Sequence, residues 1–139
     1  MDAKETIYRI LHIEDDLMYK SVLKHALLKK FVDVEVYHAE CEHDAMSILD
    51  ATPPDLIIID IDLKDSSNGL ELSYKIKQKH PEIVMFILSQ FDTLEYRLVA
   101  ERNGVECFFS KSSSLLAIFN RIEATIRDKR ISLSHECLS

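Results

Sequence analysis

Five short runs of apolar residues recur along the chain, separated by longer segments with helical spacing. The runs lie at residues 7–13, 34–37, 56–59, 83–88 and 105–109. Residues 56–59 and 83–88 are apolar without alternation, which is typical of strands covered on both faces. Between the runs, apolar side chains recur three or four positions apart, as on one face of a helix: Val22, Leu23, Ala26 and Leu27; Cys41, Ala45, Ile48 and Leu49; Leu115, Ile118, Ile122 and Ile126.

This alternation predicts an α/β fold. A (βα)5 chain builds a doubly wound, five-stranded parallel sheet with helices on both faces. The two glycines and three prolines stand at the joints between elements, where they are tolerated best. We expect one folded domain over residues 1–130 and a short polar C-terminal tail over residues 131–139, which we expect to fray.

Composition narrows the classes of partner. The net charge of −7 argues against binding to the phosphate backbone of DNA or RNA, so we expect no direct contact with nucleic acid. No apolar run approaches the roughly 18 to 20 residues that cross a bilayer, and residues 1–6 are too polar for a secretory signal. We therefore expect a cytoplasmic location with no membrane contact. Cys41, Cys107 and Cys137 have neither disulfide nor zinc spacing and are expected to be reduced thiols.

Chemically active residues follow four of the five apolar runs. In a parallel sheet, ligands bind beyond the carboxyl ends of the strands. The residues at these ends are Glu14, Asp15 and Asp16; Asp60 and Asp62; Ser89; and Ser110 and Lys111. Such a set suits phosphoryl transfer to a carboxylate, which depends mainly on positioning and charge stabilisation. Clustered carboxylates with hard oxygen ligands also suit Mg²⁺.

These motifs resemble the receiver domains of two-component response regulators, the CheY-like superfamily. The similar segments are residues 10–16, ending in Glu14-Asp15-Asp16; 55–63 around Asp60; 68–72 from Asn68-Gly69; Leu88-Ser89; and 108–111, Phe-Phe-Ser-Lys. The resemblance covers roughly residues 7–128, with the motifs in the family's order. It implies a flavodoxin-like sheet in strand order 2-1-3-4-5, with two helices on one face and three on the other.

The resemblance also implies a role for each site residue. Asp60 would be the phosphoacceptor; Glu14, Asp15, Asp60 and the backbone carbonyl of Asp62 would hold Mg²⁺; Ser89 and Lys111 would bind the phosphoryl group; and Phe108 would be the aromatic that switches with Ser89. Asp15 would be a direct ligand and Glu14 would hold a metal-bound water. Magnesium affinity should therefore depend on Asp15 and Asp60 more than on Glu14.

The implied function is a phosphorylation-dependent signalling switch rather than an enzyme with a separate substrate. A histidine kinase or a histidine phosphotransfer protein would supply the phosphoryl group, and the domain would catalyse only its own phosphorylation and autodephosphorylation. The surface made by the fourth helix, fifth strand and fifth helix would then meet a protein partner or a second copy of the chain.

Three positions depart from the common receiver pattern. Lys64 stands where a proline is usual, Gln90 where a small residue usually follows the switch hydroxyl, and Ser112 where a proline usually follows the lysine. Receivers with that last proline commonly hold the bond cis. A non-proline cis bond costs about 3 kcal/mol, so the Lys111–Ser112 peptide should be trans.

Simpler readings compete at several positions. Asp16 fits a helix cap, and Phe108 could be a core-filling aromatic without a switching role. We expect His12 to be a hydrogen-bonded core histidine, and residues 41–43 to form helix surface and core rather than a metal site. Two other functions stay open: a pseudo-receiver that binds partners without phosphorylation, and an aspartate-nucleophile phosphatase of the haloacid dehalogenase type.

Overall fold

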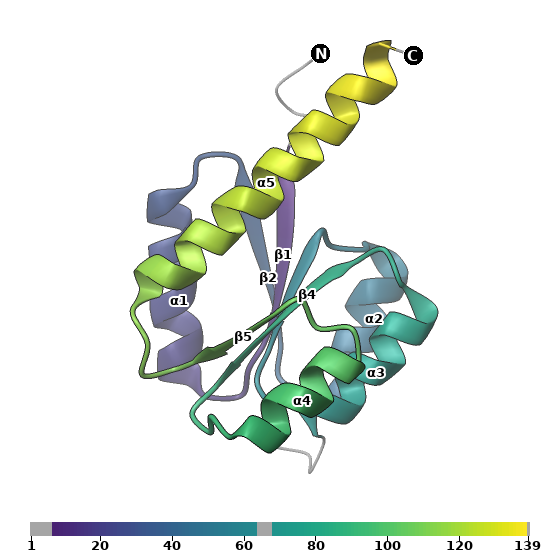
Figure 1. Ribbon diagram of the computed structural model, residues 1–139. Helices are drawn as coiled ribbons and strands as arrows, with labels where there is room; N and C mark the ends of the chain where they lie inside the picture. The colour runs from purple at the N-terminus through teal and green to yellow at the C-terminus, as the bar shows by residue number, and fades with distance from the viewer. Residues whose placement is uncertain (1–6, 64–67, 139) are drawn as a thin grey trace.

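The chain folds as a five-stranded sheet between two helical layers. The computed structural model describes residues 7–63 and 68–138 (Figure 1). Its elements, in chain order, are β1 Tyr8–Ile13, α1 Leu17–Lys30, β2 Val34–Ala39, α2 Glu42–Ala51, β3 Leu56–Ile59, α3 Gly69–Lys79, β4 Val84–Ser89, α4 Leu94–Arg102, β5 Cys107–Ser110 and α5 Leu115–Leu138.

All neighbouring strands pair in parallel, in the order β2-β1-β3-β4-β5. The predicted fold class and strand order are therefore confirmed. Helices α1 and α5 cover one face of the sheet, and α2, α3 and α4 cover the other (Figure 1). Every residue of β3 is buried, because this central strand is covered by both layers. The carboxyl ends of β1 and β3 thus lie side by side at one edge.

The two faces of the sheet hold two apolar cores, built by the residues that alternate along each strand. Leu23 and Leu27 anchor α1 in one of them, as predicted. Val22 is the exception in that stripe, because its side chain is 52% exposed. Neighbouring residues lie about 100° apart around a helix axis, so with Leu23 against the sheet Val22 turns towards solvent.

The C-terminal segment departs from the sequence prediction. Residues 131–138, expected as a short polar tail, belong to α5, which continues as a helix to Leu138 and whose last turns extend past the sheet (Figure 1). The boundary expected after residue 130 falls inside this helix. No glycine or proline follows Gly104 to stop it, and Lys129 fastens it to the sheet through Asp55, with Nζ and Oδ2 2.9 Å apart. Among the described residues, no helix is long and apolar enough to cross a membrane.

Candidate functional site

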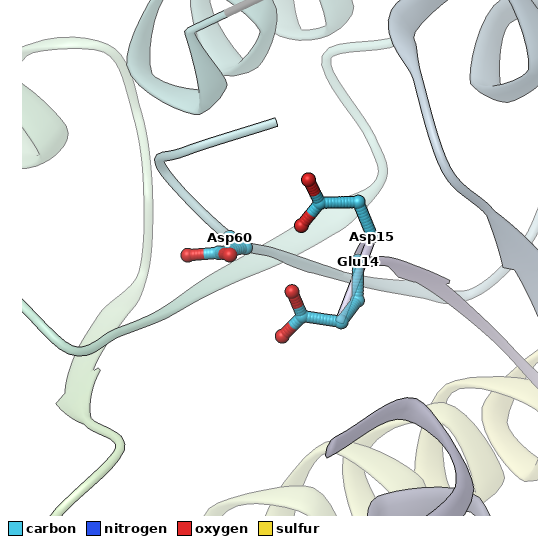
Figure 2. A group of neighbouring side chains, drawn as sticks. All are labelled: Glu14, Asp15 and Asp60. Carbon is cyan, nitrogen blue, oxygen red and sulfur yellow. The ribbon is translucent and has the colours of Figure 1, made fainter. Parts of the chain in front are cut away.

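Three carboxylates meet at the carboxyl edge of the sheet. Ile13 of β1 pairs with Ile59 of β3, so the residues that follow them, Glu14, Asp15 and Asp60, emerge next to one another. One carboxylate oxygen from each lies within 4.8 Å of the others (Figure 2). This is the convergence of acids from two strands that the sequence predicts.

Backbone contacts hold these acids in place. The amide of Asp60 donates to the carbonyl of Ile13 over 3.0 Å, and the amide of Glu14 donates to Ala39 over 2.9 Å. Gly69 begins α3 directly against this turn, and its amide donates to the carbonyl of Ile61 over 2.7 Å. A Cβ at residue 69 would lie 2.0 Å from the carbonyl oxygen of Asp60, so only glycine lets the helix approach so closely.

Lys111 supplies the cation of the site. Its Nζ lies 2.5 Å from Oε1 of Glu14 and 3.3 Å from Oδ2 of Asp60. Burial lowers the pKa of Lys111, but its contacts with Glu14 and Asp60 outweigh burial, and the net shift is upwards. The ammonium therefore stays charged beside both acids, where it can also meet the oxygens of a phosphoryl group.

Glu14 is the most strongly perturbed acid. Its side chain is fully buried. Burial, a hydrogen bond with Asp60 and the charge of Asp60 raise the pKa of Glu14 to about 7, although Lys111 pulls in the opposite direction. One ammonium among three carboxylates leaves excess negative charge at this edge, which is the condition that a bound cation relieves.

The acids outside this cluster have other roles. Asp16 caps α1, because its Oδ1 accepts hydrogen bonds from the amides of Met18 and Tyr19. The side chain of Asp62 is exposed and does not join the cluster, although its backbone forms an isolated bridge with Asn68 beyond β3. The assignment of the Asp62 carbonyl as a metal ligand remains a prediction.

The hydroxyl and the lysine come from neighbouring strands. Ser89 ends β4 and is fully buried, and its backbone carbonyl accepts from the amide of Lys111 over 2.7 Å. The Ser89 hydroxyl accepts from the amide of Phe91 over 3.0 Å. Together with Asp60, the hydroxyl and the ammonium occupy one edge of three adjacent strands.

Three contacts around the site were not anticipated from the sequence. The ring of Tyr19 on α1 lies under the Lys111 ammonium, 4.5 Å from Nζ to the ring centroid. Arg97 on α4 lies over the ring of Phe108, 4.9 Å from Cζ to the centroid, and pairs with Asp92. A weak sequence signal existed for Tyr19, an aromatic one helical turn after the acidic pair. None pointed to Arg97.

The remaining sequence predictions concern His12, Phe108 and the cysteines. His12 is a buried core residue, as predicted, and its Nδ1 has no hydrogen-bond partner among the described residues. Burial is the main cause that lowers the pKa of His12 to about 3, so the ring stays neutral. Phe108 is half-buried against the core. Cys41 precedes α2 as its cap residue, and Cys41 and Cys107 are free thiols, as expected.

Two of the three positions that depart from the receiver pattern, Gln90 and Ser112, lie among the described residues. The Lys111–Ser112 peptide is trans, as predicted. The amide of Ser112 donates to the hydroxyl of Ser110 over 3.2 Å, so a turn without proline is held by serine hydroxyls. Gln90 is exposed, and Lys64 lies outside the described residues.

The donor set fits a hard divalent cation. Carboxylate oxygens are the ligands that Mg²⁺ prefers, and it binds through one or two carboxylates while it retains several waters. Asp15 and Asp60 present such oxygens beside the buried Glu14. Among the residues that the structure describes, no histidine or cysteine, which favour zinc, joins this cluster.

Comparison with known proteins agrees with this geometry. A family model described as the response regulator receiver domain matches residues 10–123. The transcriptional regulatory protein QseB of Haemophilus influenzae is 28% identical over 130 residues, which cover 94% of this chain and 57% of QseB. The nitrogen assimilation regulatory protein NtrX of Azorhizobium caulinodans is 32% identical over 111 residues, or 75% of this chain and 24% of NtrX. The chain thus spans only part of these relatives.

Solved structures give the same result. The non-phosphorylated HemR receiver domain from Leptospira biflexa has a TM-score of 0.77 at 27% identity and covers 86% of this chain and 94% of its own. A CheY-like receiver domain protein from Methanospirillum hungatei JF-1 has a TM-score of 0.79 at 20% identity, with 91% and 98% of the two chains covered, which supports the fold.

Receiver domains are in general signalling modules rather than enzymes. They bind Mg²⁺ at an acidic pocket, receive phosphoryl groups from histidine kinases and act on downstream partners. The match of the family model to most of the chain, together with the shared fold, establishes that this chain belongs to the response regulator receiver domain family of two-component systems.

Proposed function

We propose that this receiver is a phosphorylation switch whose phosphoacceptor is Asp60. The observation that carries the proposal is the position of Asp60: it is nearly buried at the end of the central strand, with the Lys111 ammonium 3.3 Å from its Oδ2. A histidine kinase or a histidine phosphotransfer protein would donate the phosphoryl group, in the cytoplasm.

In this reaction an oxygen of the Asp60 carboxylate attacks the phosphorus of the donor. The bond between phosphorus and the donor breaks, and an acyl phosphate forms on Asp60. Lys111 and the Ser89 hydroxyl bind the phosphoryl oxygens and stabilise the charge that they carry. Water later attacks the same phosphorus, the bond between phosphorus and the Asp60 carboxylate breaks, and inorganic phosphate leaves. This is the only turnover that we propose for the domain.

Mg²⁺ would be held by Asp15, Asp60 and the Asp62 carbonyl, with Glu14 on a bound water, and it would supply charge neutralisation for the incoming group. Asp15 would therefore matter more for magnesium affinity than Glu14. The Glu14 carboxylate, buried and paired with Lys111, also keeps the ammonium at the edge of the sheet until a phosphoryl group competes for it.

Phosphorylation would change the surface formed by α4, β5 and α5. Ser89 would move towards the phosphoryl group and Phe108 would follow it, because the two side chains lie near the ends of neighbouring strands. A protein partner, or a second copy of the chain, would read that surface. A phosphoryl group need only favour one of two existing packings by a few kcal/mol.

The two alternative functions differ in the chemistry that they require. A phosphatase of the haloacid dehalogenase type needs metal-binding acids after the lysine. Here Glu123 and Asp128 lie exposed on α5, away from the carboxyl edge, which weighs against that reading. A pseudo-receiver would have no use for a complete set of carboxylates, hydroxyl and ammonium.

The test is phosphorylation by a small donor such as acetyl phosphate in the presence of Mg²⁺, followed by intact-mass measurement. The wild-type protein should gain one phosphoryl group and Asp60→Ala none. Asp55→Ala is the matched control, because Asp55 precedes the same strand at its other end, and it should be phosphorylated like the wild type. An unmodified wild-type protein would favour the pseudo-receiver.

A further inference from the structure

Arg97 links the β4–α4 loop to Phe108. Its guanidinium forms a two-pronged contact with the Asp92 carboxylate, 2.6 Å from Nε to Oδ1 and 2.9 Å from Nη2 to Oδ2. The same group lies over the Phe108 ring, with Cζ 4.9 Å from the centroid, and Nη1 donates to the Phe108 carbonyl over 3.3 Å. One side chain therefore contacts both the loop and the expected switch aromatic.

The loop that holds Asp92 is tied to the phosphorylation site. The Ser89 hydroxyl accepts from the amide of Phe91, which directly precedes Asp92. A continuous path thus runs from Ser89 through the loop to Asp92, then through Arg97 to Phe108. Its two ends are the residues that the proposed function couples.

The chemistry of the contact suits an adjustable restraint. A planar guanidinium can hold a carboxylate in its plane while its face stacks on an aromatic ring, which lysine cannot do. The side chains of Arg97 and Asp92 are 45% and 37% exposed, so solvent weakens their attraction. Such a pair biases the position of Phe108 without locking it.

We propose that Arg97 is a positioning residue that keeps Phe108 in the unphosphorylated packing for as long as Asp92 holds it. This inference rests on the proposed function. When Ser89 turns towards phosphorylated Asp60, its hydroxyl leaves the amide of Phe91. The loop is then free to shift, Asp92 moves with it, and Arg97 no longer covers the ring.

Breaking the Asp92–Arg97 pair should mimic part of the response to phosphorylation, the release of Phe108 from its unphosphorylated packing. Asp92→Asn and Arg97→Gln each remove the charge pair at an exposed position, where the fold should tolerate the change. Arg97→Lys keeps the charge but loses the fork and the stacking, so it should behave like Arg97→Gln rather than like the wild type. Arg102→Gln, at the exposed end of the same helix, is the matched control.

The experiment places 4-fluorophenylalanine at position 108 and records ¹⁹F spectra before and after acetyl phosphate with Mg²⁺. Intact mass reports phosphorylation in each sample. The phosphorylated wild type defines one ¹⁹F signal. In the unphosphorylated Asp92→Asn and Arg97→Gln proteins, the fraction of this signal should be about two-fold or more that in the unphosphorylated wild type. Arg102→Gln should match the wild type. All these variants should accept the phosphoryl group.

The outcomes separate the two proposals. If the wild type gains no phosphoryl group, the proposed function fails and the role of Arg97 fails with it. If all proteins are phosphorylated but the Asp92 and Arg97 variants give wild-type spectra in both states, only the role of Arg97 is overturned. A double variant that shifts no further than either single variant would show that the two residues act as one unit.

Discussion

Two aspartates flank the central strand β3, and their surroundings differ sharply. Asp55 precedes the strand, where its Oδ2 accepts from the amide of Arg9 over 2.8 Å and from Nζ of Lys129 over 2.9 Å. Asp60 follows the strand, where it lies beside Glu14 and Asp15 and shares a single ammonium with Glu14. An aspartate therefore has a different role at each end of β3: Asp55 is held in a network of contacts, and Asp60 lies in a cluster of acids.

The difference separates a structural network from a reactive one. At the amino edge, the Asp55 carboxylate is paired with an ammonium and a backbone amide, and this network fastens α5 to the sheet through Lys129. At the carboxyl edge, acids outnumber cations, which costs stability and leaves the carboxylates available to a cation and a phosphoryl group. Perturbed carboxyl groups at a strand end are thus a better guide to function than the number of charges alone.

The largest effect should appear in the pH dependence of stability without Mg²⁺. Folding raises the pKa of Glu14 from 4.5 to about 7, mainly by burial and by Asp60, so between these values the folded protein holds a proton that the unfolded chain has released. The contribution of Glu14 to the free energy of unfolding therefore falls as pH rises through that window, by an amount on the order of a few kcal/mol.

The matched measurement is urea unfolding of wild type and Glu14→Gln across that range. His12 and His38 have pKa values lowered to about 3 and 4, mainly by burial, so their contributions change in the opposite sense and grow as pH rises towards 6.5. They are common to both proteins and cancel in the difference. The advantage of Glu14→Gln should grow from pH 4.5 to about 7 and then level off. A difference that stays flat would contradict the perturbed environment of Glu14.

At the other end of the strand, Asp55→Ala should lower the free energy of unfolding by about 2 kcal/mol, because it leaves the backbone amide of Arg9 without its acceptor and the partly buried Lys129 ammonium without its carboxylate. Asp50→Ala is the control. Asp50 pairs with Lys79 over 3.1 Å, but both side chains are more than half exposed, so its loss should cost less than about 0.5 kcal/mol. Equal losses in the two variants would show that the Asp55 network adds nothing to the fold.

Asp60→Asn should have the reverse effect. Without Mg²⁺, removal of one carboxylate from the cluster should raise the free energy of unfolding by about 1 kcal/mol. Added Mg²⁺ should stabilise the wild type more than the variant, because the variant lacks a ligand. Thermal unfolding with and without Mg²⁺ measures both effects. A variant that is less stable than the wild type would mean that the Lys111–Asp60 contact outweighs the repulsion.

The smallest effect should come from Tyr19. Its ring lies 4.5 Å from the Lys111 ammonium and helps to hold it at the edge of the sheet. Tyr19→Leu should slow phosphorylation by acetyl phosphate about two- to five-fold, in line with a cation–π contact of about 0.5–1 kcal/mol, while Tyr19→Phe keeps the ring and the rate. If Phe is as slow as Leu, the hydroxyl rather than the ring is responsible.

The sequence was sufficient for the strands and the carboxyl edge because both depend on local patterns. Buried runs such as Leu56–Ile59 predict strands, and parallel pairing brings the carboxyl ends of these strands to one edge of the sheet. The length of α5 was not predictable in the same way, because the Lys129–Asp55 contact that holds it joins distant parts of the chain. The Arg97–Phe108 and Tyr19–Lys111 contacts likewise depend on how helices sit on the sheet.

One experiment identifies directly which carboxylate carries the phosphoryl group. Borohydride reduces an aspartyl phosphate to homoserine and leaves free carboxylates unchanged, so tandem mass spectrometry of the treated protein locates the modified residue. After acetyl phosphate with Mg²⁺, homoserine should appear at position 60 and not at Asp55, Asp15 or Asp62. Homoserine at any of those three positions, with Asp60 intact, would contradict the central role of Asp60.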